Sequence, residues 1–410
     1  MLLNNLDTGP AAADKGAAAG RTSGRKWMIR LSLLVAVLVV ADQLVLHLLV
    51  RENQFLGTPL APYATATLQP SVAAELERVR DPVQRAGLHL AFDPELGWEP
   101  LPGYQSTVAS YDRFGARECG EDRTEEVPLG RRRILAFGCS FTNGTEVADD
   151  ETWAVRMEAE RPELEVFNFG VPAYGLGQAL MRMERRAPGL GADEIWLVMM
   201  PAAAQRPSTH LRLLVRTWTS IPWLKPRFSV NESGGLARHP NPVSSIEETL
   251  RLFDEPGAFN ERLAGADPWY DAVRRAFTAA PEHAFFLGRL FWSWRTFKNG
   301  ERLRGLDGRG DSLVPLHLAI ALEFDARVRE LGATPRYVIL PGPLDLPAPD
   351  GDGGIVTAPL MEQLTAHGVS TLDATPAILS VPREERWTSG WHYSPVTNRA
   401  VGRWLADQLP

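Results

Sequence analysis

Cysteine is nearly absent from this sequence, whose 410 residues include only Cys119 and Cys139. Two cysteines supply neither a disulfide framework nor the four ligands of a structural zinc site. An oxidising compartment would permit one bridge between them, but we expect both thiols to be free. No spacing of cysteine, histidine and acidic residues is typical of a metal site, so no metal ion is predicted.

Positive charge is also in short supply, with 43 Lys and Arg against 50 Asp and Glu and a net charge of −7. This balance argues against a nucleic-acid partner. Internal repeats, a phosphate-binding loop and a dinucleotide-binding glycine pattern are all missing, so no cofactor is implied. The hydrophobic content of 44% is ordinary for a globular protein that buries a core.

A long apolar run near the N-terminus, from Trp27 to Val50, is long enough to cross a bilayer. Residues 1–26 are rich in small and polar residues and are predicted to form a disordered cytoplasmic tail. Basic residues precede the run, which predicts a single-pass signal-anchor at 27–50 with a periplasmic or extracellular C-terminal domain. A cleaved signal peptide is disfavoured because no small-residue cleavage site follows the apolar core. Asp42 and His47 are costly in lipid, so a partly interfacial segment is the alternative.

Beyond the anchor we expect a stalk at 51–90 and one α/β domain at 91–410, with a largely helical insertion at about 205–315. Strand-like and helix-like segments alternate along this domain. This alternation predicts a parallel sheet covered by helices, with a site at the carboxyl ends of the strands. The expected strands are 133–138, 164–169, 194–200, 335–340 and 369–373, and the expected helices are near 151–160, 176–187, 316–331 and 357–367.

The most informative segment is RRILAFGCSFTNG at 132–144. An apolar, strand-like run breaks at Gly138 and delivers Ser140 into a turn of small residues. A serine exposed at a strand's carboxyl end, with backbone N–H groups nearby, is a candidate nucleophile. The alternative is a plain strand-to-helix connection with a capping serine.

Two later segments accompany this motif: VFNFGVPAYGLGQ contains Gly170, and WHYSPVTNRAVGRWLADQL contains His392. Together the three resemble the SGNH or GDSL-type serine hydrolases and acyltransferases, and the flanking segments resemble the membrane-anchored branch of that family. The resemblance implies a flavodoxin-like three-layer α/β/α sandwich with a central parallel sheet. It also implies Ser140 as the nucleophile, His392 as the general base, and the N–H groups of Ser140 and Gly170 as the oxyanion hole.

Two positions depart from the family pattern. The family's third block ends in an asparagine that completes the oxyanion hole, whereas here the strand EIWLVMM leads into PAAAQ, where Gln205 is the one amide. The family aspartate three residues before the histidine is replaced by Ser389, which cannot carry the charge that orients an imidazole. Three upstream carboxylates are alternative partners for the histidine: Asp373, Glu384 and Glu385.

By this resemblance the protein is expected to be a membrane-anchored esterase or O-acyltransferase that acts on acetyl esters of a cell-surface or exported polysaccharide. One alternative is a catalytically inactive scaffold that binds glycan or a membrane-protein partner. Another is a lipid-directed esterase that uses the aromatic segment FFLGRLFWSWRTF at 285–297. For that segment we favour an amphipathic helix that packs on the core.

Overall fold

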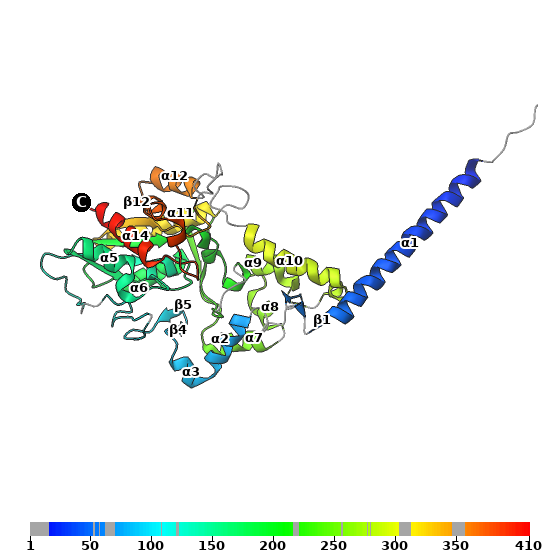
Figure 1. The fold of residues 1–410 in the computed structure, drawn as a ribbon, viewed down its shortest axis with the longest axis horizontal. Coiled ribbons are helices and arrows are strands. Elements are labelled where there is room, and N and C mark those ends of the chain that lie inside the picture. Colours follow the sequence, from blue (N-terminus) through cyan, green and yellow to red (C-terminus); the bar gives the residue numbers. More distant parts are fainter. Residues whose placement is uncertain are drawn as a thin grey trace, which may run out of the picture.

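A computed structural model of the chain shows an α/β domain, a helical region beside it and a long N-terminal helix that extends away from both (Figure 1). The first 15 residues of the predicted tail lie outside the described residues. The structure describes residues 16–51, 54–56, 58–61, 70–107, 109–119, 123–215, 221–255, 257–276, 278, 280–302, 313–346 and 357–410.

Five parallel strands form the central sheet, in the order β12-β11-β8-β6-β7. Numbered along the chain this order is 2-1-3-4-5, which is the flavodoxin-like, doubly wound arrangement. The predicted fold class is therefore confirmed. The strands are β6 (Arg132–Phe137), β7 (Leu164–Asn168), β8 (Glu194–Met199), β11 (Thr334–Ile339) and β12 (Thr371–Asp373).

Side chains of the strands alternate between two helical layers, as a sheet buried on both faces requires. In β6, Leu135 and Phe137 face one layer, and Ile134 and Ala136 face the other. The strand and helix bounds agree with the predicted ones to within two residues. The first layer holds α6 (Leu176–Arg186), α11 (Val314–Glu330) and α12 (Ala358–Ala366), and the second holds α5 (Trp153–Glu160), α13 (Thr375–Leu379) and α14 (Pro395–Asp407).

The N-terminal helix α1 (Gly16–Leu49) carries one apolar segment, Lys26–Leu49, that is long and apolar enough to cross a membrane. A membrane span and a signal sequence share these properties. The helix begins at Gly16, whereas the sequence predicted a disordered tail as far as residue 26. The prediction is wrong for residues 16–26, where alanines with high helix propensity continue the helix toward the N-terminus.

The predicted stalk folds onto the rest of the protein. Its helix α2 (Pro70–Arg80) buries Val72 and Leu76 against the helical insertion and Val79 against the α/β domain's N-terminal hairpin. These residues lie on one face of the helix. Their spacing indicates a buried face only if another surface is present to cover it. The other elements are β1 (Val50–Arg51), β2 (Gln54–Phe55), β3 (Thr58–Pro59) and α3 (Pro82–Ala86).

The insertion has its own core, built on buried side chains such as Leu252, Phe259 and Trp269. The described part is mainly helical, with one two-stranded hairpin. Its elements are β9 (Arg227–Val230), β10 (Leu236–His239), α7 (Ile246–Asp254), α8 (Ala258–Leu263), α9 (Pro268–Val273) and α10 (Phe286–Arg302). The 3-10 turns η4 (Arg206–Ser208) and η5 (Arg212–Leu214) precede β9, and η7 (Pro281–Ala284) precedes α10.

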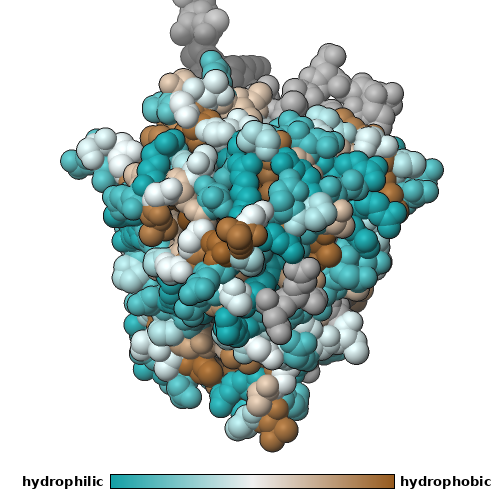
Figure 2. Space-filling model, turned by 90° about the vertical axis from the view of Figure 1, so that its left-hand side faces the viewer, coloured by the Kyte–Doolittle hydropathy of each residue, from teal (hydrophilic) through white to brown (hydrophobic). Residues whose placement is uncertain are grey.

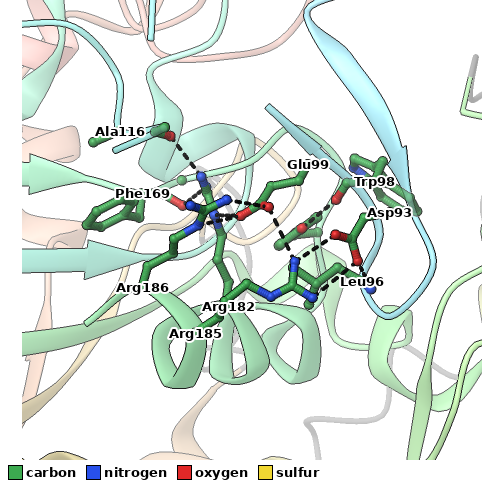
Figure 3. A network of polar contacts seen from close by, with 12 residues as sticks. Asp93, Leu96, Trp98, Glu99, Ala116, Phe169, Arg182, Arg185 and Arg186 are labelled. Atoms are coloured by element: carbon green, nitrogen blue, oxygen red, sulfur yellow. Dashed lines mark hydrogen bonds and ion pairs between the residues drawn. The ribbon is translucent and has the colours of Figure 1, made fainter. Parts of the chain in front are cut away.

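A cluster of ion pairs joins the hairpin of β4 (Leu90–Asp93) and β5 (Gly97–Pro100) to α6 (Figure 3). Nε of Arg182 and Nε of Arg186 each donate to Oε1 of Glu99 at 3.0 Å. The Arg182 guanidinium is fully buried and also donates to the backbone carbonyl of Phe169 at 2.6 Å. Glu99 therefore fixes an arginine that braces the loop following β7, close to Gly170.

Candidate active site

Ser140 begins the one-turn helix α4 (Ser140–Asn143), three residues beyond the end of β6. The turn requires a glycine at 138, because a Cβ there would lie 2.1 Å from Oγ1 of Thr142 and 2.5 Å from the carbonyl oxygen of Val198. The Ser140 hydroxyl has no hydrogen-bond partner among the described residues. The close approach at Gly138 thus presents the serine at the carboxyl edge of the sheet, as predicted.

His392 lies on a tight turn directly before α14. The turn is closed by backbone hydrogen bonds between Thr388 and His392 (2.9 Å) and between Trp391 and Thr388 (3.1 Å). Trp391 takes a left-handed conformation with φ of 72°, which is uncommon outside glycine. The His392 ring packs against Phe141, with ring centroids 5.2 Å apart. This contact sets the imidazole beside the turn that carries Ser140.

Ser140 and His392 line the same cavity, which has a volume of about 490 Å³. The structure thus brings together the two residues that the sequence placed as nucleophile and base. Apolar side chains form most of the wall, and two arginines contribute its positive charge. The other lining residues are Phe141, Met200, Ala202, Arg206, Arg212, Gly342, Pro343, Leu344, Gly390 and Trp391.

A carboxylate that the sequence reading missed faces His392. Oε2 of Glu146 lies 3.3 Å from Nδ1 of His392, within ion-pair distance but without hydrogen-bond alignment. Glu146 has φ of 75°, so its backbone is held in a conformation that favours glycine. Thr388 donates a hydrogen bond to the same carboxylate oxygen. Gly390 leaves room for it, because a Cβ there would lie 1.6 Å from Oε1 of Glu146.

The three carboxylates considered from the sequence are used elsewhere or exposed. Asp373 accepts hydrogen bonds from the backbone N–H and hydroxyl of Thr375 at the start of α13. Glu384 and Glu385 lie on an exposed 3-10 turn, η8 (Arg383–Glu385). The carboxylate that faces Nδ1 of His392 is therefore Glu146 and none of these three.

The imidazole of His392 is kept in its neutral form by its surroundings. Burial lowers the pKa of His392 below its ordinary value of 6.5, the Glu146 carboxylate opposes this shift, and the charges of Arg206 and Arg212 add to it. A neutral imidazole is the form that accepts a proton from a serine hydroxyl. The electrostatics of the cavity thus suit His392 to the work of a base near neutral pH.

The structure corrects the prediction for Gly170. Its N–H donates to Oδ1 of Asn168 at 3.0 Å, so this donor is already engaged within the protein. Gly170 instead allows close packing, because a Cβ there would lie 2.3 Å from the backbone nitrogen of Asn143. The N–H of Ser140 donates no hydrogen bond to the described residues, as expected for the first residue of a helix. Of the two predicted oxyanion donors, Ser140 remains available.

Arg206 lies in the loop that follows β8, at the start of η4. Its side chain lines the cavity, and Nη1 donates to the carbonyl of Tyr174 at 2.9 Å. Burial lowers the pKa of the guanidinium, an effect that the Cys139 side chain opposes. Gln205, the amide considered from the sequence, is buried but does not line the cavity. The guanidinium is therefore the donor that this loop offers to a bound ligand.

Lys225 fixes the loop that contains Arg206 through hydrogen bonds to backbone carbonyls. Its fully buried Nζ donates to the carbonyl oxygens of Arg206 (2.5 Å) and Pro226 (3.3 Å), and also to that of Thr209. Burial lowers the pKa of Lys225 to about 7. Because the carbonyls of Arg206 and Thr209 both accept from this one amine, the backbone from Arg206 to Thr209 is fixed.

The two cysteines are free, as predicted: Cys139 is buried next to Ser140, and Cys119 is half-buried.

No protein-family model and no curated protein matches this chain. Solved structures match it, including a lipolytic protein of the G-D-S-L family from Desulfitobacterium hafniense, at 11% identity and a TM-score of 0.31 over 68% of this chain and 100% of that one. A lipase/acylhydrolase from Enterococcus faecalis matches at 12% identity and a TM-score of 0.32, covering 68% of this chain and 94% of its own. A GDSL-like lipase from Bacteroides thetaiotaomicron matches at 8% identity and a TM-score of 0.30, covering 70% and 90%.

Likeness at this level says nothing about the reaction. The fold rests on the strand order of the sheet and on the positions of Ser140 after its first strand and His392 before its last helix.

Proposed function

We propose that this chain, with its flavodoxin-like α/β fold, is a membrane-anchored serine esterase or O-acyltransferase of the SGNH type. The observation that carries the proposal is the single cavity lined by Ser140 and His392, with a carboxylate facing the far nitrogen of the imidazole. A nucleophile, a base and an orienting group are the parts that acyl transfer requires.

In this mechanism Oγ of Ser140 attacks the carbonyl carbon of the ester, while Nε2 of His392 accepts the hydroxyl proton. His392 then gives that proton to the leaving alcohol, and an acyl-serine remains. Water or an acceptor hydroxyl reverses these steps and frees the serine. Glu146 favours the tautomer with its proton on Nδ1 and stabilises the imidazolium. The N–H of Ser140 and the guanidinium of Arg206 stabilise the oxyanion.

As substrate we propose an acetyl ester on a cell-surface or exported polysaccharide. A cavity of about 490 Å³ falls within the range of roughly 300–1,000 Å³ typical of small-molecule sites, so it has room for a sugar ring beside the ester. If α1 crosses the bilayer with its basic side inside, the domain faces the compartment in which such polymers occur.

An activity-based fluorophosphonate probe tests the proposed nucleophile. The full-length protein in detergent should be labelled, and Ser140→Ala should abolish labelling without a change in melting temperature. Ser380→Ala is the matched control, because its hydroxyl bonds only to the carbonyl of Ala377 at the end of α13. Folded protein that is not labelled would exclude the esterase and favour an inactive scaffold that binds glycan or a membrane-protein partner.

A lipid ester is the second candidate substrate, and one observation favours it. Helix α10, which exposes apolar side chains, packs against η5, the turn that carries the cavity residue Arg212. Hydrolysis of p-nitrophenyl esters of increasing chain length separates the two substrates. Preference for acetate supports the polysaccharide ester, whereas rates that rise with chain length support the lipid ester.

A further inference from the structure

Helix α10 has two different faces. One face packs on the protein so closely that a Cβ at Gly288 would lie 2.0 Å from the carbonyl oxygen of Glu282, and Ser293 accepts the N–H of Ala61 at 2.9 Å. The opposite face exposes Leu287, Leu290, Phe291 and Trp294, which we call the α10 apolar face. These residues recur at intervals of three and four, so they form one stripe along the helix.

The start of α10 is bound by α1 (Figure 1). The carboxylate of Asp42 accepts the N–H groups of Phe286 and Leu287, each at 2.8 Å. Gln43 donates to the carbonyl of Ala284 at 2.8 Å. Asp42 therefore caps the N-terminus of α10 from another helix and satisfies donors that a helix start leaves unpaired.

This contact resolves the difficulty that Asp42 presents within an apolar helix. A carboxylate exposed to lipid is costly, but here the side chain is buried against backbone donors and is only 8% exposed. Asp42 lies seven residues before the end of α1, which places it roughly 10 Å along the axis from that end. Interfacial helices bury their apolar face to a comparable depth of about 5–10 Å.

We propose that the α10 apolar face lies in the lipid of the leaflet from which α1 emerges, so that the two helices form one membrane-binding unit. This inference rests on the proposed crossing of the bilayer by α1. Near its contact with α10, α1 also exposes apolar side chains, Leu44 and Leu48. Phe55, which follows α1, packs against Phe286 with tilted rings whose centroids are 4.9 Å apart.

The opposite end of the molecule is different. Figure 2 shows the face of the α/β domain that points away from α1, which is mainly hydrophilic with scattered hydrophobic side chains. A bilayer on the side of α1 and α10, with water on the side of the α/β domain, accounts for both surfaces.

A lipid-quenching experiment on the full-length protein tests this placement. In a Cys119→Ser background, Phe291→Cys is labelled with an environment-sensitive fluorophore in nanodiscs of phosphatidylcholine and phosphatidylglycerol. Leu34→Cys on α1 and Leu129→Cys on an exposed loop are the lipid and water controls. Spin-labelled lipid should reduce the fluorescence at positions 291 and 34, and aqueous iodide should reduce it only at 129. Leu290→Cys provides a second position if the first variant melts at a lower temperature.

Each other result would overturn the inference. Iodide quenching at 291 with lipid quenching at 34 means that α10 faces water although α1 is anchored. Protection of 291 from both quenchers means that protein covers the α10 apolar face, as in a dimer. Absence of lipid quenching at 34 means that the anchor itself is wrong. Asp42→Ala should weaken lipid quenching at 291 and leave it unchanged at 34, and an unchanged signal at 291 would show that the Asp42 cap does not place α10.

Discussion

Two groups of polar residues near the sheet differ in how many of their hydrogen-bonding groups have a partner. Around Glu99, three arginines of α6 surround one carboxylate, and the fully buried Arg182 donates to backbone carbonyls with its remaining nitrogens. In the cavity, the Ser140 hydroxyl has no partner among the described residues and His392 faces Glu146 without hydrogen-bond alignment.

The difference separates residues that stabilise the fold from residues whose polar groups are left for a ligand. Saturated ion pairs fix the hairpin and the loop after β7, because every group that leaves water finds a partner. Groups left with unused hydrogen-bonding capacity in a cavity retain it for a ligand. The comparison predicts that substitutions around Glu99 reduce stability, whereas substitutions around His392 reduce rate.

Glu99→Ala should have the largest effect. Removing one partner of a buried ion pair leaves Arg182 uncompensated, so we expect the free energy of unfolding to fall by about 3–5 kcal/mol. Denaturant unfolding of the solubilised protein measures it. Glu95→Ala is the control, because its side chain is 70% exposed and its pair with Arg185 is worth about 1 kcal/mol or less. Equal losses in the two variants would contradict the assignment of Glu99 to structure.

Arg206→Met should act mainly on rate. Loss of an oxyanion donor typically lowers kcat by about a hundred- to a thousand-fold, or roughly 2.7–4 kcal/mol. Steady-state kinetics with p-nitrophenyl acetate should show this loss with KM nearly unchanged. A rise in KM at constant kcat would instead assign Arg206 to binding of an anionic group in the substrate.

Glu146→Gln should lower kcat/KM by about a hundredfold with little change in melting temperature, because the carboxylate orients His392 but is partly exposed. Gly390→Ala should produce a similar loss, since its methyl would displace the Glu146 carboxylate. Asp150→Asn, an exposed acid on the same loop, is the matched control. Full activity in Glu146→Gln would mean that the imidazole is oriented by another group.

The smallest effect is on the pH profile. Because kcat/KM requires neutral His392 and burial lowers its pKa, the rate should fall through a midpoint below pH 6.5 as the solution is acidified. Removing the Glu146 carboxylate should move the midpoint to lower pH, and removing the Arg206 charge should move it to higher pH. Midpoints that do not move in either variant would show that His392 is not the titrating group.

Much of the α/β domain was predictable because its strands and helices carry their own periodicity. Ser140 and His392 were also predictable, since each lies in a motif that states its local geometry. Glu146 was not, because it lies six residues after the serine in a loop and meets the histidine only through the tertiary fold. The role of Gly170 was predicted wrongly, because a sequence gives the residue type but not the acceptor of its backbone N–H.

The segment 51–90 was predicted as a stalk because an apolar, proline-bearing stretch and one helix-like stretch lead from the anchor into the domain. Val72 and Leu76 become core residues only against the insertion, whose own fold is not visible in local pattern. Whether the segment was a free stalk or part of the folded protein therefore could not be decided before its packing was known.

The contact between Asp42 and α10 leaves the α/β domain almost no slack relative to α1. A domain on a flexible linker samples a hemisphere around its anchor, and its reach grows with the length of the linker. Here the helix ends within the fold, so the height of the Ser140 cavity above the membrane would be set by rigid packing. A substrate of the proposed enzyme would therefore have to reach the cavity at one fixed height above the membrane.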